Sequence, residues 1–230
     1  MIKNIVLVHG AWADGSGWEG VHKILTEKGF KVTIVPNPNT SLADDVKITR
    51  AVLSMQDGPT VLVGHSYGGA IITEAGDHPN VTTLVYVAAF VPDAGESLFK
   101  MLKDAPPDPN SPILPPTDGF IWLDRNKFHA NFCADIPAGK AKFMADSQTP
   151  VGLAAFGTDL TAAAWKVKKS WYIVATDDKM IPPDAERGMA KRANAKIAEI
   201  KSSHAVYISH ADEVANVIQK AAEARVLETA

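Results

Sequence analysis

The stretch from residue 59 to residue 77 constrains the fold more than any other part of this 230-residue chain. The apolar run at residues 61–63 predicts a short buried strand, and residues 70–72 open an apolar run that predicts a buried helix. Between them stands GHSYGG, residues 64–69. A chain that turns from strand to helix so quickly forces the residue at the bend, Ser66, into a cramped backbone conformation, and the glycines two residues to either side make room for it. The stretch therefore predicts a serine hydroxyl held clear of a sheet, with a helix N-terminus beneath it.

The pattern G-x-S-x-G is weak when it stands alone. It should occur by chance in roughly one chain in twenty of this length and composition. Random matches rarely have a strand directly before them and a helix directly after, so the pattern is far more specific in this frame. It indicates a nucleophile elbow, which presents a serine at one edge of a sheet.

The rest of the chain alternates between strand-like and helix-like segments. Strands are expected at residues 4–8, 31–35, 61–63, 82–87, 170–175 and 196–200, and helices at residues 18–28, 41–55, 183–193 and 211–227. Ser41 is the expected N-cap of its helix, with Asp44 and Asp45 in the first turn, where negative charge favours the helix dipole. Apolar strands separated by helices are typical of a parallel sheet covered on both faces. The sequence therefore predicts an α/β fold with a mostly parallel sheet of about six strands.

The alternation breaks between residues 91 and 165. Seven of the fifteen prolines fall between Pro92 and Pro116, where no regular helix or interior strand can form. Helix-like segments follow at residues 120–134, 138–147 and 150–158. We expect a small helical insertion that lies over the sheet as a cap, within a single domain that spans residues 1–230.

Loops after two later strands carry the groups that a serine nucleophile needs. A serine hydroxyl reacts poorly unless a base removes its proton, and that base is usually a histidine oriented by a carboxylate. The loop after the predicted strand at 170–175 contains Asp177 and Asp178, and the loop after the strand at 196–200 ends in His204. The carboxyl ends of parallel strands meet at one edge of a sheet, so nucleophile, acid and base would converge there.

The chain resembles the α/β-hydrolases, and within them the small-cap branch that contains plant methyl-ester esterases, hydroxynitrile lyases and many bacterial esterases. The resemblance covers nearly the whole chain. The residues that carry it are VLVHGAW at 6–12, Trp18, GHSYGG at 64–69, AAFVPDAGES at 88–97, TDDKMIPP at 176–183 and SSHAVYIS at 202–209. The resemblance implies an α/β-hydrolase fold with a small helical cap.

The resemblance also implies roles for individual residues. Ser66 would be the nucleophile and His204 the base. The acid of this family stands a few residues ahead of an Ile-Pro turn, which favours Asp178, with Asp177 as the alternative. His210 is the alternative base, but it lies at the expected start of the last helix, where a histidine is more often exposed or capping.

The oxyanion formed in acyl transfer needs prearranged N–H donors. The resemblance assigns them to the backbone N–H groups of Ala11 and Tyr67. His9 would brace the loop that contains Ala11 rather than join the triad. The other histidines have no partner at a spacing suited to metal binding, so we expect no metal and no cofactor.

Two departures from related sequences narrow the chemistry. Hydroxynitrile lyases of this branch carry a threonine in the oxyanion loop and a lysine directly after the catalytic histidine, where this chain has Ala11 and Ala205. Haloalkane dehalogenases of the same fold need a carboxylate where this chain has Ser66. Hydrolysis of a carboxylic ester is therefore favoured. A ligand-binding receptor on a hydrolase fold stays open, as do perhydrolysis, acyl transfer and carbon–carbon bond hydrolysis.

Aromatic residues indicate the character of the substrate pocket. Those expected to line it are Trp12, Phe90, Trp122, Phe128 and Trp165. Their alternative role is to pack the cap onto the sheet. Since no lysine or arginine is aimed at the site, a small, neutral, fairly hydrophobic ester is the expected substrate.

Charge, hydropathy and cysteine content indicate which other partners and which cellular location to expect. The net charge is −3 and no basic stripe is present, so we expect no nucleic-acid partner. No apolar stretch is long enough to span a membrane and no signal peptide is evident, so no membrane association is expected. The single cysteine, Cys133, is consistent with a reducing, cytoplasmic location. Related proteins often dimerise through the cap, which leaves a homodimer open.

Overall fold

The computed structural model describes residues 2–103 and 108–224 of the chain. Six parallel strands form one sheet in the order β2-β1-β3-β4-β7-β8. They are β1 (Asn4–Val8), β2 (Lys31–Val35), β3 (Thr60–His65), β4 (Val81–Val87), β7 (Lys169–Ala175) and β8 (Lys196–Ile200). The predicted strands at 4–8, 31–35 and 196–200 coincide with β1, β2 and β8, and the others extend slightly beyond their predicted bounds. The predicted α/β fold is confirmed.

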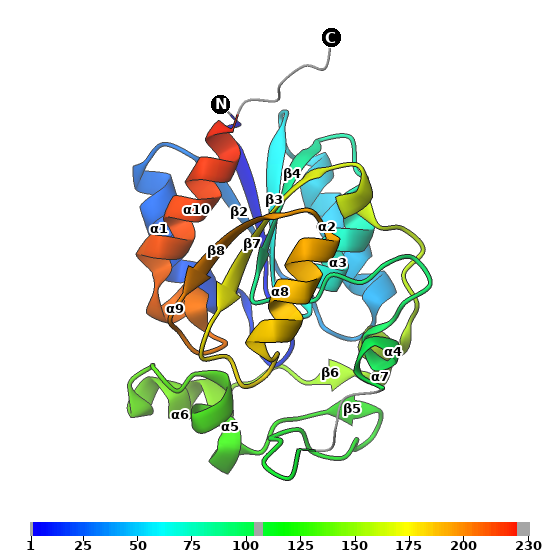
Figure 1. Ribbon diagram of the computed structural model, residues 1–230, viewed down its shortest axis with the longest axis vertical. Coiled ribbons are helices and arrows are strands. Elements are labelled where there is room, and N and C mark those ends of the chain that lie inside the picture. Colours follow the sequence, from blue (N-terminus) through cyan, green and yellow to red (C-terminus); the bar gives the residue numbers. More distant parts are fainter. Residues whose placement is uncertain (1, 104–107, 225–230) are drawn as a thin grey trace.

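Helices cover both faces of this sheet (Figure 1). On one face lie α1 (Glu19–Glu27) and α10 (Ala211–Glu223), and on the other α2 (Leu42–Ser54), α3 (Gly68–Ala75) and α8 (Pro183–Arg192). Successive strand residues point to opposite faces. In β1, Ile5 and Leu7 therefore pack with α1 and α10, whereas Val6 and Val8 pack with α2 and α3. Both faces are buried, which explains why the strand is apolar throughout rather than alternating.

Local sequence determines where α2 begins and where α1 ends. The Ser41 hydroxyl oxygen accepts the N–H of Asp44 at 3.1 Å and so caps α2. Gly29 follows α1 with a φ of +81°, a left-handed conformation that glycine adopts without strain and that ends a helix. Val21 and Leu25 of α1 are fully buried. Burial of side chains of this size contributes about 1.5–3 kcal/mol each and holds the helix on the sheet.

A cap segment, residues 98–157, lies beyond the carboxyl ends of the strands (Figure 1). Its elements are α4 (Leu98–Leu102), β5 (Phe120–Ile121), α5 (Arg125–Phe132), α6 (Ala138–Asp146), β6 (Val151–Gly152) and α7 (Leu153–Gly157). From α7 the chain returns along the side of the sheet to the amino end of β7. The cap segment therefore faces the edge of the sheet where the sequence places Ser66.

The cap segment differs in detail from the prediction. Residues 120–134 were expected to be helical, but Phe120 and Ile121 pair with the residues of β6 as an antiparallel ribbon. The helix α5 begins only after Asp124, whose side chain accepts the N–H of Asn126 at 2.9 Å. A two-residue strand is too short to produce a recognisable period, so the sequence could not reveal it.

Within the described residues, four short helices were not predicted, one of which is α4 in the cap segment. The other three lie outside the cap segment. They are the 3₁₀ helices η1 (Gly15–Trp18) and η2 (Ala164–Lys166), and the α-helix α9 (Val206–Ser209). The last helix was predicted to reach residue 227, whereas α10 ends at Glu223 and residues 225–227 lie outside the described part of the chain. Within the ranges 2–103 and 108–224, no helix is both long and apolar enough to cross a membrane.

Candidate active site

Ser66 lies at the bend between β3, which ends at His65, and α3, which begins at Gly68. Its φ is +55°, a left-handed value that residues other than glycine rarely adopt. Hydrogen bonds hold the bend on both sides, because the Ser66 N–H donates to Val87 O at 3.2 Å and the Ser66 carbonyl accepts the N–H of Gly69 at 2.9 Å. Backbone conformations that the surroundings enforce in this way cluster at functional sites.

Small residues allow three backbone segments to meet at Ser66. A Cβ at Gly64 would lie 2.5 Å from Gly68 O, so any side chain there would obstruct the turn. A Cβ at Gly10 would lie 2.7 Å from Ser66 Cβ and 2.8 Å from His65 O. The loop that follows β1 therefore packs directly against the serine.

His204 and Asp178 form a buried pair beyond the carboxyl ends of β8 and β7. His204 Nδ1 lies 2.5 Å from Asp178 Oδ2, and the two residues are 0% and 5% exposed. The second carboxylate oxygen, Oδ1, accepts the N–H groups of Met180 at 2.6 Å and Ile181 at 3.0 Å. These hydrogen bonds fix the carboxylate against the histidine. Asp177, the alternative acid, is exposed.

His65 connects the loop of His204 to the bend at Ser66. The two imidazole rings lie 4.7 Å apart, centroid to centroid, and His65 Nε2 donates to the His204 carbonyl at 2.9 Å. Burial, together with the neighbouring His204, holds the pKa of His65 well below its usual value, so the ring is neutral. No sequence signal pointed to this contact, because the position before the serine is unrestricted in the elbow pattern.

The second ring nitrogen of His204 is directed into the interior. His204 Nε2 is buried and has no hydrogen-bond partner among the described residues, so the Ser66 hydroxyl is not bonded to it in this structure. Catalytic hydrogen bonds are often long or absent without substrate and form in the complex. Leaving a buried nitrogen without a hydrogen bond costs free energy. Because Nε2 has no partner among the described residues, it is available to accept a proton from a bound molecule or from Ser66.

The backbone N–H groups of Ala11 and Tyr67 flank the serine. Tyr67 follows Ser66 directly, and Ala11 follows Gly10, the residue that packs against Ser66. Both residues are fully buried, and in the described parts of the chain neither N–H donates a hydrogen bond. Buried N–H groups without a partner are rare in folded proteins. The two groups are therefore available to an oxygen atom of a bound molecule.

Sequence reasoning missed a buried carboxylate beside these groups. Asp45 on α2 is fully buried. Its Oδ2 accepts the Tyr67 hydroxyl at 2.7 Å and its Oδ1 accepts the Asn39 N–H at 2.8 Å. Burial raises the pKa of Asp45 to about 6. A signal was present, since Asp45 shares its helix face with Leu42 and Leu53, which are also buried.

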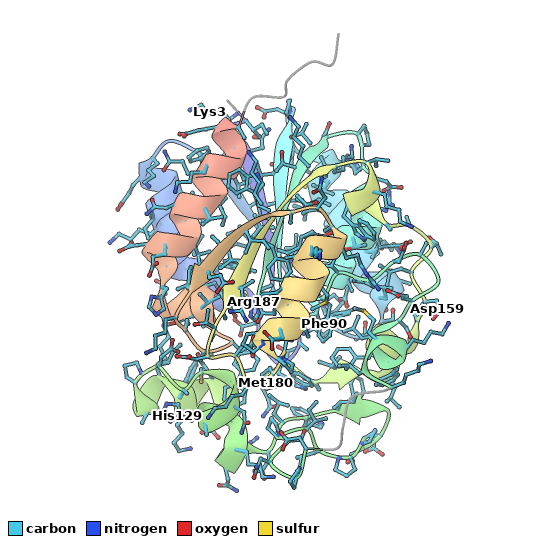
Figure 2. The ribbon with its side chains drawn as sticks, in the orientation of Figure 1. Lys3, Phe90, His129, Asp159, Met180 and Arg187 are labelled. Atoms are coloured by element: carbon cyan, nitrogen blue, oxygen red, sulfur yellow. The ribbon has the colours of Figure 1, made fainter. Side chains whose placement is uncertain are left out.

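Two of the five expected pocket aromatics lie close to the serine. The Phe90 N–H donates to the Ser66 carbonyl at 3.1 Å, and Phe90 lies on the side of the sheet that faces the cap segment (Figure 2). Trp12 follows Ala11 directly, and its indole N–H donates to Ile121 O in the cap segment at 3.0 Å. Trp12 thus joins the loop after β1 to the cap segment.

The other three aromatics lie further away. Phe128 stacks on Phe132 at 4.9 Å, and Phe132 meets the His204 ring edge-on at 5.1 Å, so Phe128 is one ring removed from the histidine. Trp122 is half-buried in the cap segment. Trp165 precedes β7 and lines a surface cavity with residues at the amino end of that strand. A parallel strand must start at the amino edge, so Trp165 lies at the end of the sheet opposite Ser66.

A cavity of about 240 Å³ adjoins the loop after β1. The larger apolar side chains that line it are Trp12, Phe143, Met144, Tyr207 and Ile208, and Asp14, Glu19 and Lys140 add charged groups to the lining. Phe143 and Met144 belong to α6, so the cap segment forms one wall and the loop that starts at Trp12 forms another. An apolar group of a small molecule can be accommodated here, next to Ala11.

The cap segment also holds the loop that carries His204. Asp135, between α5 and α6, accepts hydrogen bonds from the hydroxyls of Ser202 and Ser209 at 2.7 and 2.9 Å and from the N–H of Ser203 at 3.1 Å. In addition, the Ala205 N–H donates to Phe132 O at 3.1 Å. Residues on both sides of His204 are therefore attached to the cap segment.

One further carboxyl group joins this cluster: Glu186 on α8 is fully buried, its Oε2 accepts the Ala175 N–H at 3.1 Å, and burial together with the neighbouring Asp178 raises its pKa to about 11. The alternative base does not join it. His210, the alternative base, is half-buried, and its Nδ1 lies 2.9 Å from Glu213 Oε1. In residues 2–103 and 108–224, no group of three or more His, Cys, Asp or Glu side chains could hold a metal ion. The arrangement as it stands is an acid–histidine pair beside a strained serine with two free N–H groups.

Comparison with known proteins identifies the family of the chain. The chain matches the Alpha/beta hydrolase family over residues 5–217. It is 30% identical over 196 residues to a carbendazim hydrolyzing esterase of Nocardioides sp. (strain SG-4G), which covers 75% of this chain and 79% of the relative. It is 27% identical over 254 residues to a pyrethroid hydrolase of Sphingobium wenxiniae, covering 97% and 89%. Among solved structures, polyneuridine aldehyde esterase has a TM-score of 0.83 at 20% identity, covering 96% of this chain and 99% of that one.

Proposed function

The chain belongs to the alpha/beta hydrolase family, and from that premise we propose that it is a serine hydrolase that cleaves small, neutral, fairly hydrophobic carboxylic esters through an acyl-enzyme intermediate. Relatives named as esterases and hydrolases make it a carboxylesterase-like enzyme. The observation that carries the finer proposal is the buried hydrogen bond between His204 and Asp178, with the His204 ring 4.7 Å from the ring of His65, the residue before Ser66, and its Nε2 unpartnered among the described residues.

In the proposed reaction, Ser66 Oγ attacks the ester carbonyl carbon while His204 Nε2 takes the hydroxyl proton. Asp178 holds His204 Nδ1–H and stabilises the imidazolium that forms. The carbon–oxygen bond to the alcohol then breaks, and the alcohol leaves with the proton from Nε2. Water attacks the acyl-enzyme in the same way, with His204 as the base, and releases the carboxylic acid and Ser66.

Negative charge develops on the carbonyl oxygen at each attack. The N–H groups of Ala11 and Tyr67, which have no partner within the described residues, are suited to receive it. Removing a single donor of this kind typically lowers kcat by about 10²- to 10³-fold. The left-handed conformation of Ser66 supports the proposal, because it is the conformation that exposes the hydroxyl above the helix N-terminus.

The lining of the site supports an uncharged, apolar substrate. Phe132 packs against the His204 ring, and Trp12 borders the cavity next to Ala11. Ser66 is only 4% exposed, so the substrate must be small or must enter a closed site. The relatives named as a carbendazim hydrolyzing esterase and a pyrethroid hydrolase support a hydrolytic reaction, and the first of these names supports an ester as the bond that is cleaved.

The test is turnover of a series of p-nitrophenyl esters from acetate to octanoate by the wild type and by Ser66→Ala. We expect multiple turnovers in the wild type and loss of nearly all of them in the variant, with the chain-length preference reporting the pocket size. Ser170→Ala is the matched control, because Ser170 is also buried but lies at the amino end of β7. Substantial activity in Ser66→Ala would refute the nucleophile assignment. A single burst without turnover would instead favour a ligand-binding receptor.

A further inference from the structure

Asp45 is a buried charge that the fold alone does not require. It lies on the face of α2 that packs into the core, where the flanking positions of that face hold leucines at 42 and 53. A buried carboxylate is costly unless hydrogen bonds compensate for its lost hydration. Two hydrogen bonds to Asp45 provide this compensation, one from the Tyr67 hydroxyl at 2.7 Å and one from the Asn39 N–H at 2.8 Å.

The first of these hydrogen bonds leads to the residue after the nucleophile. The Tyr67 side chain is fully buried and packs on the Phe156 ring at 5.5 Å. Because Asp45 holds the hydroxyl at the far end of this side chain, the side chain cannot swing about its Cα–Cβ bond without breaking the hydrogen bond. The backbone of Tyr67, whose N–H is one of the two proposed oxyanion donors, is thereby anchored to α2.

The second hydrogen bond leads to the other donor. Asn39 has a φ of +59°, and its side-chain Nδ2 donates to Gly10 O at 3.2 Å. Its side-chain oxygen accepts from Asn37 Nδ2 at 2.8 Å, which fixes the orientation of the amide. Gly10 O belongs to the same planar peptide group as the N–H of Ala11. The carbonyl and the N–H of a trans peptide point in opposite directions, so holding Gly10 O determines where the Ala11 N–H points.

From these contacts we propose that Asp45 is a positioning residue that sets the two oxyanion donors relative to each other. One carboxylate joins Tyr67 on one side to Asn39, and through it to the Gly10–Ala11 peptide, on the other. The two donors come from loops after different strands, β1 and β3. His9 Nδ1 also lies 3.0 Å from Gly10 O and Gly10 packs against Ser66, but Asp45 is the side chain that joins the Tyr67 hydroxyl to Asn39. Stabilisation of an oxyanion requires both donors to be placed within a fraction of an ångström. This inference rests on the proposed function.

The test compares Asp45→Asn and Tyr67→Phe with the wild type. An amide in place of the carboxylate can accept only one of the two hydrogen bonds, because its NH₂ group faces the other donor. Tyr67→Phe removes a single hydroxyl and keeps the ring. For each variant we expect kcat for the preferred p-nitrophenyl ester to fall by about 10-fold or more while KM stays within about 2-fold, since the donors act mainly in the transition state. The affinity for an alkylboronic acid, which forms a tetrahedral adduct with the serine, should fall in parallel.

Tyr86→Phe is the matched control. The Tyr86 hydroxyl is also buried and also hydrogen-bonds a side chain, that of Thr73 on α3, at 2.9 Å. Thr73 in turn donates to Gly69 O at 2.8 Å, so this pair reaches the turn after Ser66, but among the described residues Tyr86 bonds neither Asp45 nor Asn39. It should lose a similar amount of stability and keep the wild-type kcat and boronic-acid affinity. The double variant Asp45→Asn/Tyr67→Phe should have a kcat no lower than that of Asp45→Asn alone, because both substitutions disrupt the same hydrogen-bonded group of residues.

The outcomes separate the inference from the proposed function. If the wild type shows Ser66-dependent turnover but Tyr67→Phe behaves like Tyr86→Phe, the role of Asp45 is refuted and the proposed function stands. Tyr67→Phe alone decides this point if Asp45→Asn does not fold. If the wild type shows no Ser66-dependent turnover, the proposed function and the inference fall together.

Discussion

The imidazole of His65 packs against the imidazole of His204, with the two rings tilted by 52°, and donates a hydrogen bond to the carbonyl of His204. The residue before the proposed nucleophile thus supports the proposed base through both its ring and its backbone. Tyr207 packs on the other side of His65 at 4.3 Å. Because the pKa of His65 is held well below 6.5, this support consists of a neutral ring at the pH values where the enzyme is folded.

We expect His65 to make the fold sensitive to acid. Its folded-state pKa is lowered, so below pH 6.5 the unfolded chain binds a proton that the folded chain does not. The free energy of unfolding should therefore decrease as pH falls below 6.5, by up to about 1.4 kcal/mol per pH unit from this group. The free energy of unfolding, measured with urea at several pH values between 5 and 7, should depend less steeply on pH for His65→Phe than for the wild type, because phenylalanine cannot titrate. Equal slopes for the two proteins would contradict the assignment.

The choice between the two aspartates can be tested directly. Asp178→Asn removes the acceptor of His204 Nδ1–H, so kcat for an ester should fall by roughly 10³- to 10⁴-fold, as in other triads. Asp177→Asn changes an exposed neighbour in the same loop and should leave turnover near the wild-type value. Steady-state kinetics of the two variants check this expectation. A greater loss in Asp177→Asn would assign the acid to that residue.

Asp45 should affect stability in the direction opposite to His65. Its pKa is raised from 3.8 to about 6, so between these pH values the folded chain holds a proton that the unfolded chain releases. The wild type should lose about 3 kcal/mol of unfolding free energy from this group as pH rises from 4 to 7. Relative to the wild type, Asp45→Asn should therefore become more stable over this rise in pH. Asp44→Asn is the adjacent control, because hydrogen bonds from Ser41 and Thr40 lower the pKa of Asp44 and give the opposite trend.

The contact between Gly10 and Ser66 predicts a strong effect of one added methyl group. In Gly10→Ala the Cβ would meet Ser66 Cβ at 2.7 Å and His65 O at 2.8 Å, so the loop after β1 must shift. We expect a loss of about 1–3 kcal/mol in stability and a fall in kcat of roughly 10²-fold. Gly188→Ala, inside α8 with nothing within 4 Å of the new Cβ, should instead add up to about 1 kcal/mol. Thermal unfolding and ester kinetics would measure both, and wild-type kcat in Gly10→Ala would count against the contact.

The sheet and the members of the candidate triad were accessible from sequence for one physical reason. In a parallel sheet each strand is an apolar run, and the residues after each run must meet at one edge. That rule placed Ser66, His204 and an aspartate in neighbouring loops without any knowledge of side-chain packing. It could not choose between Asp177 and Asp178, because the choice depends on how one loop turns.

Residues that act through tertiary contacts were not accessible in this way. Asp45 has the sequence environment of an ordinary helix N-terminus, and only its place on the buried face of α2 sets it apart. Asp135 lies 67 residues from Ser202, and no local pattern joins them. The ribbon of β5 and β6 arises because two distant dipeptides pair in the cap segment, where propensities are weak.

The hydrogen bonds from Asp135 and Phe132 to the loop around His204 have a consequence for how a substrate is admitted. A rigid rotation of the cap segment away from the sheet would either break these hydrogen bonds or displace the loop that carries His204. The position of His204 thus depends on the position of the cap segment, so an enzyme with the cap segment fully displaced would be inactive. We therefore expect a substrate to enter through smaller movements of side chains in the cap segment, which leave the loop around His204 in place.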